Sequence, residues 1–166
     1  DAVLVLTNSA LDAAISALRE MRLGEGERLK TDLAARAETI LSLTAQIALR
    51  APQVVEEYRT KLNERIAVLL TKGEVDAARL ATEVALFADR ASIDEEIVRL
   101  KSHVVQMKQL LDSPEPAGRK LDFVVQEMNR EFNTIGSKAN DATLTNLVLE
   151  GKAEIEKIRE QVQNIE

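Results

Sequence analysis

Residues 118–138 read GRKLDFVVQEMNREFNTIGSK, and this stretch has the clearest helical period in the chain. Successive residues of an α-helix turn by roughly 100° about its axis. On that wheel the apolar residues fall on one side, which predicts a helix whose apolar side lies in the core of a bundle. This apolar stripe consists of Leu121, Val124, Val125, Met128, Phe132 and Ile135.

The other side of the same helix has an unusual polar composition. A solvated helix face is usually rich in Lys and Glu, whereas Asn and Asp are weak helix formers because their side chains compete for backbone hydrogen bonds. Such a face indicates a partner that uses these donors and acceptors, and RNA is one such partner. Hydrogen bonding between the helices of an oligomer is the alternative. The polar residues are Arg119, Asp122, Gln126, Asn129, Arg130 and Asn133.

The first 70 residues show the same helical spacing. We expect a first helix that is capped by Asn8 or Ser9 and that ends at Gly24 and Gly26. A long helical region follows from about residue 27 to about residue 70. Pro52 lies inside it and predicts a kink or a helix restart, because proline lacks the N–H group of the helical hydrogen bond.

Four shorter helices are predicted after a turn at Lys72–Gly73. They run from about 76 to 90, 92 to 111, 119 to 135 and 141 to 162. Ser92 with Glu95 three residues later has the pattern of a capping box. Gly136 and Ser137 are expected to end the helix that starts near residue 119. The predicted fold class is therefore all-α, with long helices in elongated hairpins or a bundle.

Composition agrees with this fold and excludes several functions. The chain has 166 residues, of which 45% are hydrophobic and only 2% aromatic, so we expect a core of Ala, Leu, Val and Ile. The absence of cysteine excludes disulfides and thiolate metal sites. A net charge of −6 argues against a protein that coats nucleic acid by bulk electrostatics. We see no apolar run of roughly 20 residues and no signal peptide, so we expect no membrane partner and a cytoplasmic location.

Several stretches together resemble a known family. These are GRKLDF at 118–123, QEMNRE at 126–131, NTIGSK at 133–138 and IREQVQNIE at 158–166, with upstream matches between Arg79 and His103. The pattern is similar to the C-terminal part of the YicC-like bacterial endoribonucleases, and the similarity weakens before about Glu25. Phe132 departs from it, because a small residue is commoner there in the family. On the helical wheel Phe132 faces the core, so the departure concerns local packing.

The resemblance implies an endoribonuclease that uses a divalent cation, Mn²⁺ or Mg²⁺, and that forms a ring-like homo-oligomer, a hexamer, able to enclose RNA. It also implies two regions, 1–70 as the middle part of the family and 71–166 as the C-terminal helical domain. Family members have an N-terminal domain with β-structure, which we do not expect in this sequence, and the start at Asp1 suggests a fragment. The alternative function is a non-catalytic helical RNA-binding or assembly module.

Candidate site residues follow from the polar face and from the resemblance. For catalysis we select Asp122, Glu127, Asn129, Arg130, Glu131 and His103. For RNA binding we select Arg119, Lys120, Gln126, Asn133, Ser137 and Lys138. For the metal we select Asp122, Glu127 and Glu83, because carboxylates hold a cation that assists phosphodiester cleavage.

One helix cannot supply this metal site alone. Asp122 lies roughly 140° from Glu127 on the wheel, so a second helix or subunit must contribute ligands. His103 is the only histidine, which excludes a mechanism with two histidines of one chain as acid and base. An ion-paired histidine at the edge of the core is its other interpretation. The candidates for the second helix are Glu83, Asp89, Asp94, Glu95 and Glu96.

Overall fold

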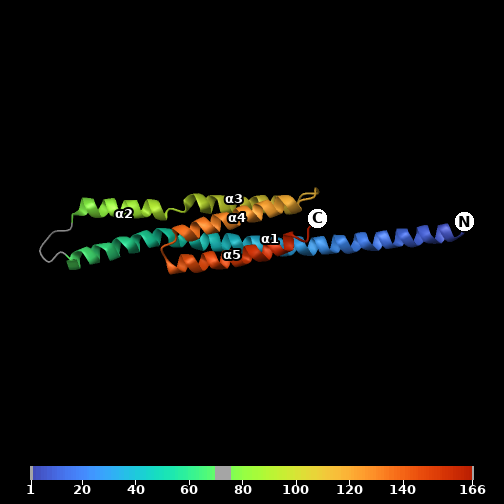
Figure 1. Cartoon of the computed structure of the whole chain (residues 1–166), viewed down its shortest axis with the longest axis horizontal. Helices are drawn as coiled ribbons and strands as arrows, with labels where there is room; N and C mark the ends of the chain where they lie inside the picture. Colours follow the sequence, from blue (N-terminus) through green and yellow to red (C-terminus); the bar gives the residue numbers. More distant parts are fainter. Residues whose placement is uncertain (1, 70–75, 166) are drawn as a thin grey trace.

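The computed structural model describes residues 2–69 and 76–165, and the regular elements in these ranges are all α-helices (Figure 1). The predicted all-α, elongated fold is confirmed. The helices are α1 (Ala2–Leu69), α2 (Ala77–Ala91), α3 (Asp94–Leu111), α4 (Gly118–Lys138) and α5 (Ala142–Val162).

Four of the helices form an antiparallel bundle. The middle of α1 packs against α3 and α5, and α4 closes the ring because it also packs against α3 and α5. Each helix runs opposite to its two neighbours (Figure 1). Two ion pairs show this order for α1 and α5, since Arg36 contacts Glu154 whereas Arg50, later on α1, contacts Asp141, which precedes Glu154 in the chain.

The core of the bundle contains the apolar stripe that the sequence predicts on α4. All six of its side chains are buried. They meet buried residues from the other three helices, so one continuous core joins them. These residues include Leu33, Ile40 and Ile47 of α1, Leu100, Val104 and Met107 of α3, and Leu144, Ile155 and Ile158 of α5.

Helix α1 extends beyond the bundle at both ends. At the far end it pairs with α2, where the rings of Tyr58 and Phe87 stack with centroids 3.8 Å apart. At the other end its first part projects away from the other helices (Figure 1). Large apolar side chains are exposed there, namely Val3, Leu4, Val5, Leu6, Leu11, Ile15, Leu18, Met21 and Leu23.

This exposed part of α1 is long and apolar enough to cross a membrane by length and composition alone. An 18-residue window near its N-terminus has a mean hydropathy of 1.3, and none of the residues in this window is buried. This finding differs from the sequence analysis, which looked for an uninterrupted apolar run. Polar residues such as Asn8 and Asp12 interrupt the run, but the mean hydropathy of the window stays high in spite of them.

The predicted helix ends within the first 70 residues are wrong, whereas the kink that Pro52 alternatively predicts stays a prediction. Helix α1 begins at Ala2, so Asn8 and Ser9 do not cap it, and it continues through Gly24 and Gly26. Glycine costs only about 1 kcal/mol in a helix interior, which a long helix can absorb. Helix α1 also continues through Pro52, so there is no restart.

The helix ends after residue 75 are mostly as predicted, with two differences. Asp76 and Asp141 are the N-caps of α2 and α5. The capping box at Ser92 is wrong, because Ser92 ends α2 and Ile93 precedes α3 without a side-chain cap. Helix α4 continues past Gly136 to Lys138. The predicted turn at Lys72–Gly73 lies outside the described residues.

The division of the chain at residue 70 stays a prediction about sequence organisation. In space, residues 33–54 of α1 share one core with residues that follow Ile93.

Helices α4 and α5 approach closely because Gly151 has no side chain. A Cβ atom at Gly151 would lie 2.4 Å from Cε1 and Cζ of Phe132, whose side chain is fully buried. The ring cannot move without displacing its neighbours in a close-packed core. The large ring of Phe132 is therefore accommodated by the glycine opposite it.

We predict that Gly151→Ala lowers the free energy of unfolding by about 1–3 kcal/mol through overpacking. In a Phe132→Leu background the same substitution should cost much less, because the smaller side chain leaves room for the methyl group. Urea unfolding of the four proteins measures this coupling. Additive effects of the two substitutions would contradict the proposed contact, and Gly24→Ala, which meets nothing within 4 Å, is the control.

An ion pair joins α1 to the start of α5. Arg50 donates from Nη2 to Oδ2 of Asp141 at 2.7 Å and from Nε to Oδ1 at 3.1 Å. Asp141 also accepts a hydrogen bond from the backbone N–H of Leu144 as the N-cap. The hydrogen bonds from Arg50 are the main reason that the pKa of Asp141 falls from 3.8 to about 2.

We predict that Asp141→Asn destabilises the protein at neutral pH but not near pH 2. The pKa of Asp141 is lowered on folding, so its stabilisation is present above pH 3.8 and is lost as the pH falls toward 2. Asparagine is also a good N-cap, so this change removes the charge and keeps the cap. The measurement is the urea midpoint of both proteins between pH 2 and pH 7. Asp76→Asn, at a cap whose partners among the described residues are backbone N–H groups, should show a much smaller pH-dependent difference.

Candidate metal and RNA site

Three potential metal ligands meet between α3 and α4. They are His103 of α3 and Glu127 and Glu131 of α4, and one ligand atom of each lies within 4.8 Å of the other two. Glu127 and Glu131 are one helical turn apart, so both point to the same side of α4. The antiparallel packing of α3 brings His103 to this side. Glu131 is buried, whereas His103 and Glu127 are half-buried.

Two arginines lie against the carboxylates of this group. Nη1 of Arg99 is 3.6 Å from Oε1 of Glu131, and Nη1 of Arg130 is 3.8 Å from Oε2 of Glu127. Two carboxylates in one place repel each other, and burial of Glu131 adds a desolvation cost. The arginines offset part of this repulsion. Both remain largely exposed, with 54% and 73% of the side-chain surface of Arg99 and Arg130 accessible.

The donor set fits a divalent cation that accepts both nitrogen and oxygen ligands. An imidazole nitrogen with two carboxylate oxygens suits Mn²⁺ or Zn²⁺ better than Mg²⁺, which prefers oxygen ligands and retains several waters. Three protein ligands also leave coordination positions for water or a phosphate oxygen.

A second polar pair extends the same side of the α3–α4 interface. Lys138 donates to Oε1 of the buried Glu96 at 2.9 Å. Burial alone would raise the pKa of Glu96, but the hydrogen bond from Lys138, a backbone hydrogen bond and nearby positive charge together lower it. Oε2 of Glu96 has no hydrogen-bond partner among the described residues. Polar groups therefore continue along this seam, from Glu127 to Lys138 on α4.

Asp122 and most of the carboxamide residues lie on the other side of α4, toward α5. Gln126 donates to Oδ2 of Asp122 at 2.6 Å. Asn129 is half-buried, and its Oδ1 has no hydrogen-bond partner in the described part of the chain. Asn133 is exposed. The three-residue group of α3 and α4 does not include Asp122, so the metal role of Asp122 stays a prediction.

The remaining candidates lie outside this group as well. Glu83, Asp89, Asp94 and Glu95 are exposed on α2 and α3, and Glu95 is paired with Arg99. Of the candidates on α2 and α3, His103 is therefore the one that lies close to Glu127, and these four carboxylates do not belong to the group. Each member of the group was a candidate in the sequence, but the grouping was not predicted.

The residues predicted to bind RNA are spread along α4. Arg119 and Lys120 are exposed near its start, and Lys120 lies 3.3 Å from Glu115. Ser137 is exposed near its end, where its hydroxyl donates to the backbone oxygen of Thr134. Lys138 is half-buried because it pairs with Glu96. The basic residues therefore lie at both ends of α4, with the three-residue group between them.

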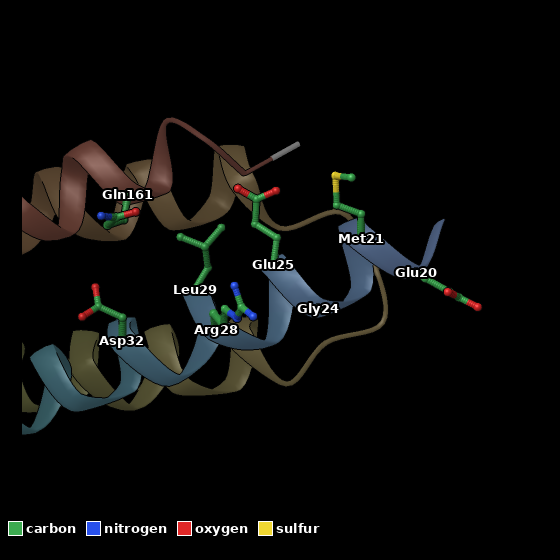
Figure 2. A pocket seen from close by; sticks show the side chains of 8 residues that line it. All are labelled: Glu20, Met21, Gly24, Glu25, Arg28, Leu29, Asp32 and Gln161. Carbon is green, nitrogen blue, oxygen red and sulfur yellow. The ribbon is translucent and has the colours of Figure 1, made fainter. Parts of the chain in front are cut away.

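A separate, open hollow lies on α1 (Figure 2). Its volume is about 590 Å³, and its wall has charges of both signs. None of the three grouped ligands lines it, so it does not belong to the candidate site. The lining residues are Glu20, Met21, Gly24, Glu25, Arg28, Leu29, Asp32 and Gln161.

Comparisons with known proteins agree with the sequence resemblance. The family description "Endoribonuclease YicC-like, C-terminal" matches residues 47–166. The chain is 51% identical over 162 residues to "Probable endoribonuclease YicC" of Clostridioides difficile (strain 630), which covers 97% of this chain and 55% of that protein. It is 35% identical over 158 residues to the protein of the same name from Haemophilus influenzae, covering 95% of this chain and 54% of that protein. The chain thus spans about half the length of these curated relatives.

We predict that the three grouped residues bind Mn²⁺. His103→Ala, Glu127→Gln and Glu131→Gln should each weaken binding by about 100-fold, because each removes one of three protein ligands. Asp122→Asn should leave binding unchanged. Calorimetric titration of the purified chain with MnCl₂ gives the affinities. If Asp122→Asn has the largest effect, the site lies on the α5 side of α4 instead.

Proposed function

The chain belongs to the YicC-like endoribonuclease family, and we propose from this that it takes part in RNA cleavage with a divalent cation held by His103, Glu127 and Glu131. The observation that carries the proposal is the meeting of these three candidate ligands between α3 and α4, within 4.8 Å of one another. This location is also inside the matched part of the chain, residues 47–166.

The chemistry of the proposed site divides between the cation and the protein. When bound, a divalent cation polarises a phosphoryl oxygen and lowers the pKa of a bound water. His103 and the buried Glu131 would hold and orient it. Glu127 is less buried and has a second carboxylate oxygen, so it is the group best placed to accept a proton from an attacking 2′-hydroxyl of the RNA.

Basic residues of α4 would bind the RNA backbone on either side of this centre. Arg130 is 73% exposed and lies one turn from Glu127, so it can neutralise the phosphate under attack. Arg119 and Lys120 at one end and Lys138 at the other would contact flanking phosphates. Residues 118–138 contain four basic and three acidic side chains, so this segment is slightly positive within an acidic chain.

We also propose that the protein acts as a homo-oligomer, of which a hexameric ring is the form that the family resemblance implies. The exposed apolar side chains at the start of α1 support a contact with another polypeptide, because a single bundle leaves them in water.

A non-catalytic RNA-binding or assembly module remains the second candidate. The same exposed apolar side chains of α1 favour it, since they fit a role in assembly that needs no chemistry.

Cleavage of an end-labelled single-stranded RNA tests the proposed function. We predict Mn²⁺-dependent cleavage that stops with EDTA and falls about 100-fold or more in Glu131→Gln. Glu156→Gln, which changes an exposed glutamate of α5, is the matched control and should cleave normally. Cleavage that persists in EDTA would exclude the metal mechanism. RNA binding without cleavage by the parent chain would favour the second candidate.

A further inference from the structure

Arg99 lies between the protein surface and the buried carboxylate of Glu131. Its Nη2 donates to Oε2 of the exposed Glu95 at 3.0 Å, one turn earlier on α3. Its Nη1 lies 3.6 Å from Oε1 of Glu131. The side chain of Arg99 is 54% exposed, whereas that of Glu131 is 4% exposed. Arg99 therefore reaches inward from solvent to a carboxylate that solvent hardly touches.

The contact between Arg99 and Glu131 is electrostatic rather than a formed hydrogen bond. A separation of 3.6 Å exceeds the usual range of 2.7–3.2 Å for N–H···O bonds. Neutralisation of a buried carboxylate still requires a nearby positive charge. Arg99 supplies that charge without a fixed geometry, so its guanidinium is free to change partner. Its bond to Glu95 is no obstacle, because an exposed pair of this kind is weak.

A cation bound by the three grouped ligands would supply the same compensation at closer range. Glu131 would then be neutralised by direct coordination, and the guanidinium of Arg99 would be repelled by the new positive charge. A guanidinium at the rim of such a site has the shape and charge to bind a phosphate with two parallel hydrogen bonds. The RNA phosphate nearest the cation is the anion that would reach it.

We propose that Arg99 exchanges partners: it pairs with Glu131 before an ion binds at His103, Glu127 and Glu131, and it turns to an RNA phosphate afterwards. This inference rests on the proposed function and adds a residue to it, together with an order of events. Arg99 competes with the cation for Glu131 and then binds substrate. Its removal should therefore have opposite effects on metal binding and on RNA binding, whereas loss of a merely structural contact would weaken both.

The first experiment measures Mn²⁺ affinity without RNA. Arg99→Gln removes the competing charge and should tighten Mn²⁺ binding by about fivefold, the size expected for loss of a partly exposed ion pair. Arg99→Lys keeps the charge and should restore the parent affinity. Arg159→Ala is the matched control, because Arg159 is similarly exposed and pairs with Glu156 on α5. Thermal melting of each variant confirms that the bundle is intact.

The second experiment measures RNA binding with a 2′-O-methyl RNA oligonucleotide, which lacks the 2′-hydroxyl nucleophile. Mn²⁺ should raise the affinity of the parent protein for this oligonucleotide. In Arg99→Gln the increase should be about tenfold smaller, and the salt dependence should lose about one phosphate contact. Arg99→Lys should recover only part of it, because an ammonium group lacks the guanidinium fork.

The outcomes separate this inference from the proposed function. Tighter Mn²⁺ binding with weaker Mn²⁺-dependent RNA binding in Arg99→Gln supports the exchange of partners. Unchanged or weaker Mn²⁺ binding in Arg99→Gln, with normal binding by the parent, overturns the exchange and leaves the metal site intact. If the parent protein does not bind Mn²⁺ at all, the proposed metal site fails, and the role of Arg99 fails with it.

Discussion

The burial of one apolar stripe of α4 between α3 and α5 is the constraint on which the rest of the molecule depends. Leu121, Met128 and Ile135 are almost completely buried, which fixes the rotation of α4 about its own axis. That rotation determines which neighbouring helix each of the two flanks of α4 faces. One flank, with Glu127 and Glu131, meets α3, and the opposite flank, with Asp122 and Asn129, lies toward α5. The chemistry on each side is therefore a consequence of core packing.

The sequence predicts this stripe because the 3.6-residue period is a local property of one helix. The angle and depth at which two helices meet depend on all their side chains together, so the group of His103, Glu127 and Glu131 could not be predicted from one helical wheel. The prediction of helix ends within α1 was wrong for another reason. Gly24, Gly26 and Pro52 each disfavour a helix locally. Their free-energy cost is small beside the stabilisation that a packed helix of 68 residues gains along its length. Pro114 and Pro116 follow the end of α3, where the local signal against helix and the packing agree.

Close packing also explains how the large ring of Phe132 fits between α4 and α5. A phenylalanine at position 132 needs space that α5 supplies through Gly151. Such a pair is visible in the sequence only as a glycine on an apolar seam, without any indication of its partner. Because Phe132 is on the α5 side of the stripe, its bulk does not disturb the α3 side, where the candidate ligands lie.

Two groups of polar contacts in the bundle differ in length. Those between α1 and α5 have short hydrogen bonds, such as the 2.7 Å contacts of Arg36 with Glu154 and of Arg50 with Asp141. Those of the candidate site, at 3.6 Å for Arg99 and 3.8 Å for Arg130, are longer than hydrogen bonds. A buried carboxylate with only long contacts is costly if its one purpose is to hold helices together, since an apolar residue would do this at lower cost. The long contact of the buried Glu131 with Arg99 therefore fits a carboxylate that binds a ligand better than one that only holds helices together.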